Sequence, residues 1–193
     1  PGYLADVARV CRERGALLIL DEVQTGLGRT GTCWCYEQEG VQPDIVTTGK
    51  GLSGAVYPMA ATIMRSDVLH VLDEDPFAHI ATYGGAEVGC AAALAVLDAL
   101  DAPGFLERVR DLGERFEAGL DGLGCEVRRR GLFIGLKWPA EGDGLTAARR
   151  LFDAGIWAVP AGNDTSVTQY LPPLVLTDAQ AGELLEATRG ALA

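Results

Sequence analysis

Two charged residues stand just after segments that we expect to be strands. Asp21 follows the apolar run at residues 16–20, and Lys50 follows the segment 44–48 after a single glycine, Gly49. In open α/β sheets, ligands lie outside the carboxyl ends of the strands, which is where both residues would stand. An amine that loses its proton is a nucleophile, and a carboxylate favours the protonated form of a basic neighbour. The pair therefore predicts either a site of covalent chemistry or an ordinary salt bridge.

The use of lysine favours the chemical interpretation. Only two lysines occur, Lys50 and Lys137, against 14 arginines. A sequence that avoids lysine for ordinary surface charge nevertheless keeps one between two glycines. Arginine does not replace lysine where the amine must become a nucleophile.

The elements that must position these residues alternate between strands and helices. Apolar spacing predicts a helix over residues 3–14 that ends at Gly15, and Ser66-Asp67 predicts the cap of a second helix that runs through Leu72. Continuous apolar runs are typical of strands covered on both faces. The strands expected in this half are 16–20, 44–48 and 60–64, with a short helix over 33–39. This alternation indicates an α/β layer with a mostly parallel sheet.

The order of expected helices and strands in the second half indicates an α+β arrangement. Pro103-Gly104 breaks the pattern, so we place a boundary near residues 101–103 and expect domains at 1–101 and 102–193. Thr177 and Gln180 have the spacing of a capping box, which predicts that a last helix starts near Asp178. The other expected elements are a mostly buried helix over 90–100, an amphipathic helix over 105–120, a strand over 132–138, a helix over 145–154, strands at 156–159 and 169–171, and a polar turn at 163–166.

Composition narrows the class of partner. The chain has 193 residues, of which 48% are hydrophobic, and a net charge of −11. The acidic balance without a basic stripe speaks against nucleic acid and anionic membranes, and no apolar run reaches the ~18 residues of a membrane span. We therefore expect a small-molecule partner.

Cysteine usage bears on location and on metals. The five cysteines are scattered and odd in number, without a secretory leader, so we expect a reduced, cytoplasmic protein. Cys33 and Cys35 form the only close pair; with just His70 and His79 as possible co-ligands we interpret them as partly buried thiols and expect no metal. The sequence opens at Pro1 without methionine, and we expect it to be a piece of a longer chain.

An ordered set of motifs resembles the class III aminotransferases of the ornithine, acetylornithine, 4-aminobutyrate and putrescine group. The resemblance covers the whole chain and is strongest over residues 1–100. Its motifs are LILDEVQTG at 18–26, GRTG at 28–31, TGKGLSG at 48–54, PMAA at 58–61, TYGG at 82–85 and LPPL at 171–174. The resemblance implies a fold-type I pyridoxal-phosphate enzyme, represented by the later part of its large domain and an α+β C-terminal small domain.

The resemblance also implies roles for four residues. Lys50 would form the Schiff base with pyridoxal 5'-phosphate and later move the substrate proton, and Asp21 would accept a hydrogen bond from the protonated ring nitrogen. Gln24 would reach the ring hydroxyl, unless it is a turn residue. Thr82 would donate to the cofactor phosphate across a homodimer interface, unless it is a helix cap. For Arg29 we favour a structural role in anchoring the loop after Asp21.

The implied reaction moves an amino group from a primary amine or ω-amino acid to a 2-oxo acid. One departure concerns substrate choice, because many members of the family carry arginine where this chain has Gln169. Two alternatives stay open. The first is an aminomutase, decarboxylase or racemase of the same fold, and the second is a catalytically silent fragment or dimerisation module.

Overall fold

The computed structural model describes residues 2–75 and 77–193, so Pro1, where the sequence opens, lies outside it. The chain forms two compact units. The first runs up to Gly28 and resumes over Thr32–Phe105, and the second consists of Arg29–Gly31 and Leu106–Ala193. Each unit has its own sheet, and each is described by itself.

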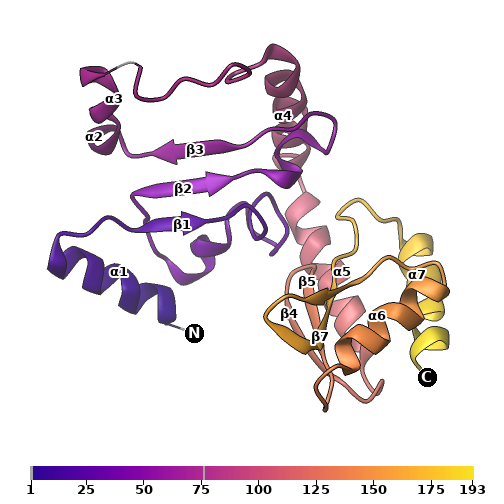
Figure 1. Cartoon of the computed structure of the whole chain (residues 1–193). Coiled ribbons are helices and arrows are strands. Elements are labelled where there is room, and N and C mark those ends of the chain that lie inside the picture. The colour runs from indigo at the N-terminus through magenta and orange to yellow at the C-terminus, as the bar shows by residue number, and fades with distance from the viewer. Residues whose placement is uncertain (1, 76) are drawn as a thin grey trace. The chain divides into compact units, whose positions relative to one another are not determined.

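The first unit is built on a three-stranded sheet (Figure 1). Its strands are β1 (Ile19–Asp21), β2 (Ile45–Thr48) and β3 (Ala61–Met64), in that spatial order. The β1–β2 pair is parallel, as expected, but β3 runs antiparallel to β2, with Thr48 opposite Ala61. The sheet is therefore mixed. The segment after β2 reverses the chain at the sheet edge, so β3 begins beside the end of β2.

Short helices surround this sheet. They are α1 (Tyr3–Arg14), the 3-10 helices η1 (Cys35–Glu39) and η2 (Lys50–Ser53), α2 (Ser66–Leu69), α3 (Val71–Glu74) and α4 (Glu87–Leu100). The expected first helix is confirmed, and Gly15 ends it in the left-handed conformation at φ 66°. The single helix expected from Ser66 is instead two short helices, α2 and α3.

Two segments of the first unit are less buried than their composition predicts. In the run before Asp21, Leu18 is buried while its neighbours Leu17 and Ile19 are exposed, so only one face of β1 is covered within the unit. Helix α4 packs near η2, and Val96 Cγ2 lies 3.5 Å from the position that a Cβ on Gly54 would take. Its other face leaves Val88 63% and Leu94 61% exposed. The expectation of a mostly buried helix is therefore wrong for this unit.

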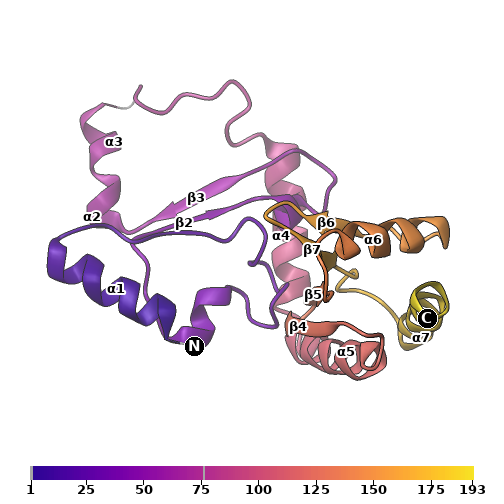
Figure 2. The ribbon, with the colours of Figure 1, turned by 60° about the horizontal axis from the view of Figure 1, so that its bottom comes forward.

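The second unit is an antiparallel sheet with three helices (Figure 2). The strands lie in the order β4 (Glu126–Arg130), β5 (Phe133–Lys137), β7 (Asp164–Tyr170) and β6 (Val159–Ala161), and the helices are α5 (Phe105–Leu120), α6 (Asp143–Asp153) and α7 (Asp178–Leu192). No single helix of the described residues is long and apolar enough to cross a membrane, although the bent pair α4 and α5 passes by length and composition when taken together.

Several expectations for the second unit are confirmed. The amphipathic helix is α5, which buries Val109, Leu112, Phe116 and Leu120. The capping box is present, because Thr177 Oγ1 accepts the Gln180 N–H at 3.3 Å and Gln180 Oε1 accepts the Thr177 N–H at 2.9 Å. Strand β4 was not expected, and the expected polar turn at 163–166 is wrong in part, because β7 already begins at Asp164.

Candidate active site

Asp21 is the last residue of β1. The parallel ladder continues one bond beyond it, where the N–H of Glu22 donates to the Thr47 carbonyl at 2.8 Å. The Asp21 side chain is exposed, and its Oδ1 accepts the N–H of Val23 at 2.9 Å. Within residues 2–75 and 77–193 this carboxylate takes part in no ion pair, so its second oxygen is available to a ligand.

Lys50 stands just beyond β2, at the sheet edge where Asp21 ends β1. It is the first residue of η2 and its side chain is exposed. Its backbone has φ 46°, a left-handed conformation that costs a non-glycine residue of order 1–3 kcal/mol and is typical of functional sites. In the described part of the chain the amine forms no hydrogen bond and no ion pair. The salt bridge between Asp21 and Lys50 that the sequence left open does not form.

Lys137 contrasts with Lys50. Its ammonium group lies in the second unit and pairs with Asp164 Oδ2 at 2.8 Å, and it also contacts Ser166 Oγ. This pairing lowers the pKa of Asp164 to about 2. Of the two lysines, Lys137 is thus paired within the second unit and Lys50 is the one with a free amine.

The turn after Asp21 contains Gln24 and a residue to which we assigned no role. Glu22 is only 3% exposed, and its carboxyl group accepts hydrogen bonds from Thr25 Oγ1 at 2.5 Å and from the Tyr36 N–H at 3.0 Å. Gln24 lies in this turn and is half-buried. Because Tyr36 is 14 residues from Glu22, no local spacing in the sequence could have shown the contact.

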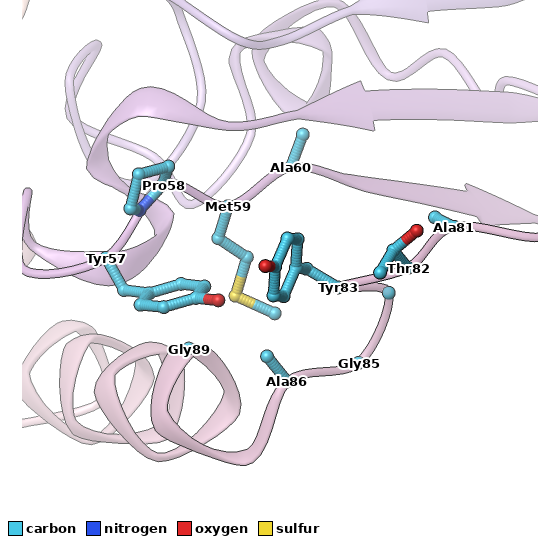
Figure 3. Close-up of a pocket in the computed structure, with 11 residues that line it drawn as sticks. Tyr57, Pro58, Met59, Ala60, Ala81, Thr82, Tyr83, Gly85, Ala86 and Gly89 are labelled. Carbon is cyan, nitrogen blue, oxygen red and sulfur yellow. The ribbon is translucent and has the colours of Figure 1, made fainter.

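Thr82 lines a hollow of about 500 Å³, and Asp21, Gln24 and Lys50 are not among its lining residues (Figure 3). The hollow is lined by residues 57–60, 81–86 and Gly89, and Figure 3 shows the Met59 side chain extending between the rings of Tyr57 and Tyr83. The N-cap of α4 is Ala86, with no side-chain cap bond, so Thr82 is not the helix cap. The structure therefore brings Asp21 and Lys50 to one sheet edge with Gln24 in the adjoining turn, and places the exposed Thr82 in the lining of a hollow that none of these three residues lines.

Thr48, two residues before Lys50, has a buried hydroxyl group. Thr48 ends β2 and is 1% exposed, and its Oγ1 has no hydrogen-bond partner among the described residues. Buried polar atoms without partners are uncommon, and they concentrate at places where water, a ligand or another segment completes the structure. Sequence reasoning passed over Thr48 because threonine in a strand is ordinary.

Arg29 has the structural role expected for it. Its guanidinium group donates to the Pro172 carbonyl at 2.6 Å and to the Leu132 carbonyl at 3.3 Å, and its own carbonyl accepts the Leu132 N–H at 3.0 Å. Burial lowers the pKa of this arginine. Three bonds to backbone groups of the second unit occupy Arg29 and leave it outside the candidate site.

The five cysteines form no disulfide, and all of them are partly buried. Burial, together with the negative charges of Glu37, Asp101 and Glu22, raises the pKa of Cys33. No group of three or more His, Cys, Asp or Glu side chains among the residues that the structure describes is arranged to hold a metal ion.

The chain matches known proteins over its whole length. The family model of class III aminotransferases matches residues 1–192. An uncharacterised aminotransferase from Archaeoglobus fulgidus is 44% identical over 192 residues, which are 96% of this chain and 45% of that protein. The chain thus spans about half the length of the curated relative it matches.

Solved structures agree with the family match. An ornithine aminotransferase from Toxoplasma gondii, described with partial occupancy of PLP at its active site, is 33% identical with a TM-score of 0.90, over 100% of this chain and 46% of that one. An acetylornithine aminotransferase from Elizabethkingia anophelis is 30% identical with a TM-score of 0.88, over 99% of this chain and 51% of that one. These neighbours confirm the expected fold-type I architecture. The chain belongs to the class III aminotransferase family, whose cofactor is pyridoxal 5'-phosphate.

Proposed function

We propose that the protein carrying this chain is a pyridoxal-phosphate-dependent aminotransferase that moves an amino group from a primary amine or ω-amino acid to a 2-oxo acid. The observation that carries the proposal is the free amine of Lys50, in a left-handed turn at the sheet edge where Asp21 ends β1. Family membership supports it independently.

The donor set fits the cofactor. Lys50 supplies a free amine for its aldehyde, and the open oxygen of Asp21 supplies a negative partner for its ring nitrogen. When bound, the cofactor supplies an electron sink for the electrons that remain after the substrate loses a proton. In this proposal Asp21 keeps the ring nitrogen protonated, Lys50 holds the cofactor and moves the proton, and Gln24 binds the ring hydroxyl.

Thr82 completes the proposal through a second subunit. We assign its hydroxyl to the cofactor phosphate in a neighbouring copy of the chain, as the family resemblance implies. The exposure of the Thr82 side chain supports this assignment. So do the exposed Tyr83 next to it and the exposed Val88 and Leu94 of α4, which form the kind of apolar surface that a partner covers.

The test for Lys50 is chemical labelling of the purified protein. Borohydride reduction in the presence of pyridoxal 5'-phosphate, followed by peptide mapping, is expected to place the pyridoxyl group on Lys50, with Lys50→Ala as the unlabelled control. Label on Lys137 instead would overturn the assignment.

The reaction class needs a separate measurement. Incubation with a panel of amines and 2-oxoglutarate is expected to consume the amine and to form glutamate. A product made from the amino substrate alone, without an acceptor, would favour an aminomutase, decarboxylase or racemase of the same fold. A protein that binds no cofactor would be a silent module.

A cytoplasmic location is part of the same proposal. Its support is that none of the five cysteines takes part in a disulfide, as is usual in a reducing compartment. Alkylation of the freshly purified protein in denaturant without reductant, followed by peptide mapping, is expected to find Cys11, Cys33, Cys35, Cys90 and Cys125 all modified.

A further inference from the structure

The turn that joins Asp21 to Gln24 is held by one side chain. The carboxyl group of Glu22 accepts the Thr25 hydroxyl at 2.5 Å within the turn and the N–H of Tyr36 at 3.0 Å in η1. Glu22 is therefore bonded both to its own turn and to an element 14 residues further along the chain.

The backbone of the same residue fixes the turn to the sheet. The Glu22 N–H donates to the Thr47 carbonyl of β2 at 2.8 Å, and its carbonyl accepts the Gly26 N–H at 3.0 Å. Four hydrogen bonds thus converge on Glu22, which separates Asp21 from Val23, and the Val23 N–H is the donor that binds the Asp21 carboxylate.

Close packing leaves this turn little room to shift. A Cβ on Gly26 would lie 2.8 Å from the Trp34 ring and 2.8 Å from the Glu22 carbonyl oxygen. The ring of Trp34 therefore lies directly against the turn. The Glu22 carboxyl group is only 3% exposed and accepts two hydrogen bonds. Hydrogen bonds in such a buried place are stronger than at the surface, so they fix the backbone on either side of Glu22.

We propose that Glu22 is a positioning residue, which holds Asp21 and Gln24 in the orientation that binds the pyridine ring. This inference rests on the proposed function. Glu22 itself does not touch the cofactor and acts only through its neighbours. A misplacement of about 1 Å in such groups is enough to cost about a hundredfold in rate, so the expected effect is measurable.

The test compares Glu22→Gln and Glu22→Ala with the matched control Asp44→Asn. Asp44 is also a partly buried carboxylate of the first unit, which accepts the Leu18 N–H at 2.7 Å and pairs with Arg65 at 2.5 Å. It lies at the opposite, amino end of β1 and β2. The Asp44→Asn change removes the charge that pairs with Arg65 without touching the turn after Asp21.

Two measurements are made on the purified full-length protein. Hydrogen–deuterium exchange without cofactor is expected to quicken about fivefold in a peptide covering residues 21–28 of Glu22→Gln, and to stay unchanged there in Asp44→Asn. The dissociation constant of pyridoxal 5'-phosphate is expected to rise about tenfold in Glu22→Ala and less in Glu22→Gln, whose amide oxygen can still accept the Tyr36 N–H.

The outcomes separate this inference from the function on which it rests. A wild-type protein that binds no pyridoxal 5'-phosphate would contradict the proposed function before any variant is compared. Unchanged exchange in the 21–28 peptide, or equal loss of affinity in Glu22→Gln and Asp44→Asn, would overturn the positioning role while leaving the function intact. If Glu22→Ala does not fold, Glu22→Gln carries both measurements.

Discussion

At the scale of single residues, Lys50 has a backbone conformation that disfavours residues with a side chain. A left-handed conformation disfavours any residue with a Cβ by about 1–2 kcal/mol, and the φ of 46° at Lys50 lies in that region. Glycine would adopt the same conformation freely. A lysine kept here stabilises the fold less than glycine would, which is the expected sign of a residue retained for chemistry.

The first prediction compares two variants that both lack the amine. Lys50→Gly is expected to be more stable to unfolding than Lys50→Ala by about 1 kcal/mol, because only alanine keeps the left-handed penalty. Urea denaturation of both variants without cofactor measures the difference. Equal stabilities would mean that the turn at Lys50 is not strained.

The second prediction concerns the acid stability of the second unit. Lys137 and Ser166 hold the pKa of Asp164 at about 2, below the value of about 3.9 for an unfolded aspartate. The resulting stabilisation is present above about pH 4 and is lost as the pH falls through about 2. The melting temperature of Asp164→Asn is expected to be lower than that of the wild type at pH 7, and the difference is expected to narrow between about pH 4 and 2. A gap that stays constant over this range would contradict the assigned ion pair.

At the scale of elements, η1 is packed against the turn that follows β1. Gly26 makes this packing possible because the Trp34 ring occupies the space where a side chain would stand. Gly51 is different, since the nearest atom to its Cβ position is Leu27 Cδ1 at an ordinary 3.8 Å. The two glycines therefore differ in what a methyl group would meet.

The third prediction uses that difference. Gly26→Ala is expected to lower the free energy of unfolding by about 1–3 kcal/mol, because either the Trp34 ring or the turn must move. Gly51→Ala is expected to stay within about 0.5 kcal/mol of wild type. Denaturant titration of the two variants measures this difference. A Gly26→Ala protein as stable as Gly51→Ala would show that the packing of the Trp34 ring against the turn is loose.

Local sequence patterns predicted those features that depend only on neighbouring residues. Gly15 at the end of α1 and the capping box of Thr177 are features of a few neighbouring residues, and both are confirmed. The burial of α4 depends on what lies against it, so its apolar composition alone was misleading. Strand β4 was missed because its run Glu126–Arg130 is mostly charged, and it is a strand through pairing with β5.

The same distinction applies to the candidate site. Asp21 and Lys50 could be found from the sequence because the ends of two neighbouring parallel strands meet at one edge. The contact of Glu22 with Tyr36 and the unpartnered hydroxyl of Thr48 depend on packing between distant segments. Sequence spacing does not encode such contacts, so these two residues emerged only from the structure.

At the scale of the whole molecule, the proposed site is shared between two copies of the chain. Lys50 and Asp21 would come from one subunit and Thr82 from the other, so that each dimer holds two sites of mixed origin. A dimer built from two different variants then has a calculable number of intact sites. Counting the intact cofactor sites of such a dimer therefore shows which subunit supplies Thr82.

The fourth prediction uses hybrid dimers of Lys50→Ala and Thr82→Ala subunits, isolated with two affinity tags. If Thr82 acts across the interface, one site of the hybrid combines wild-type Lys50 from one subunit with wild-type Thr82 from the other, and the second site carries both changes. Half of the sites are then expected to bind pyridoxal 5'-phosphate with wild-type affinity. In the Thr82→Ala homodimer all sites are expected to bind about tenfold more weakly, because each lacks a hydrogen bond to a charged phosphate. A hybrid without any site of wild-type affinity would place Thr82 and Lys50 of one site in the same subunit, and a protein that sediments as a monomer would exclude the shared site altogether.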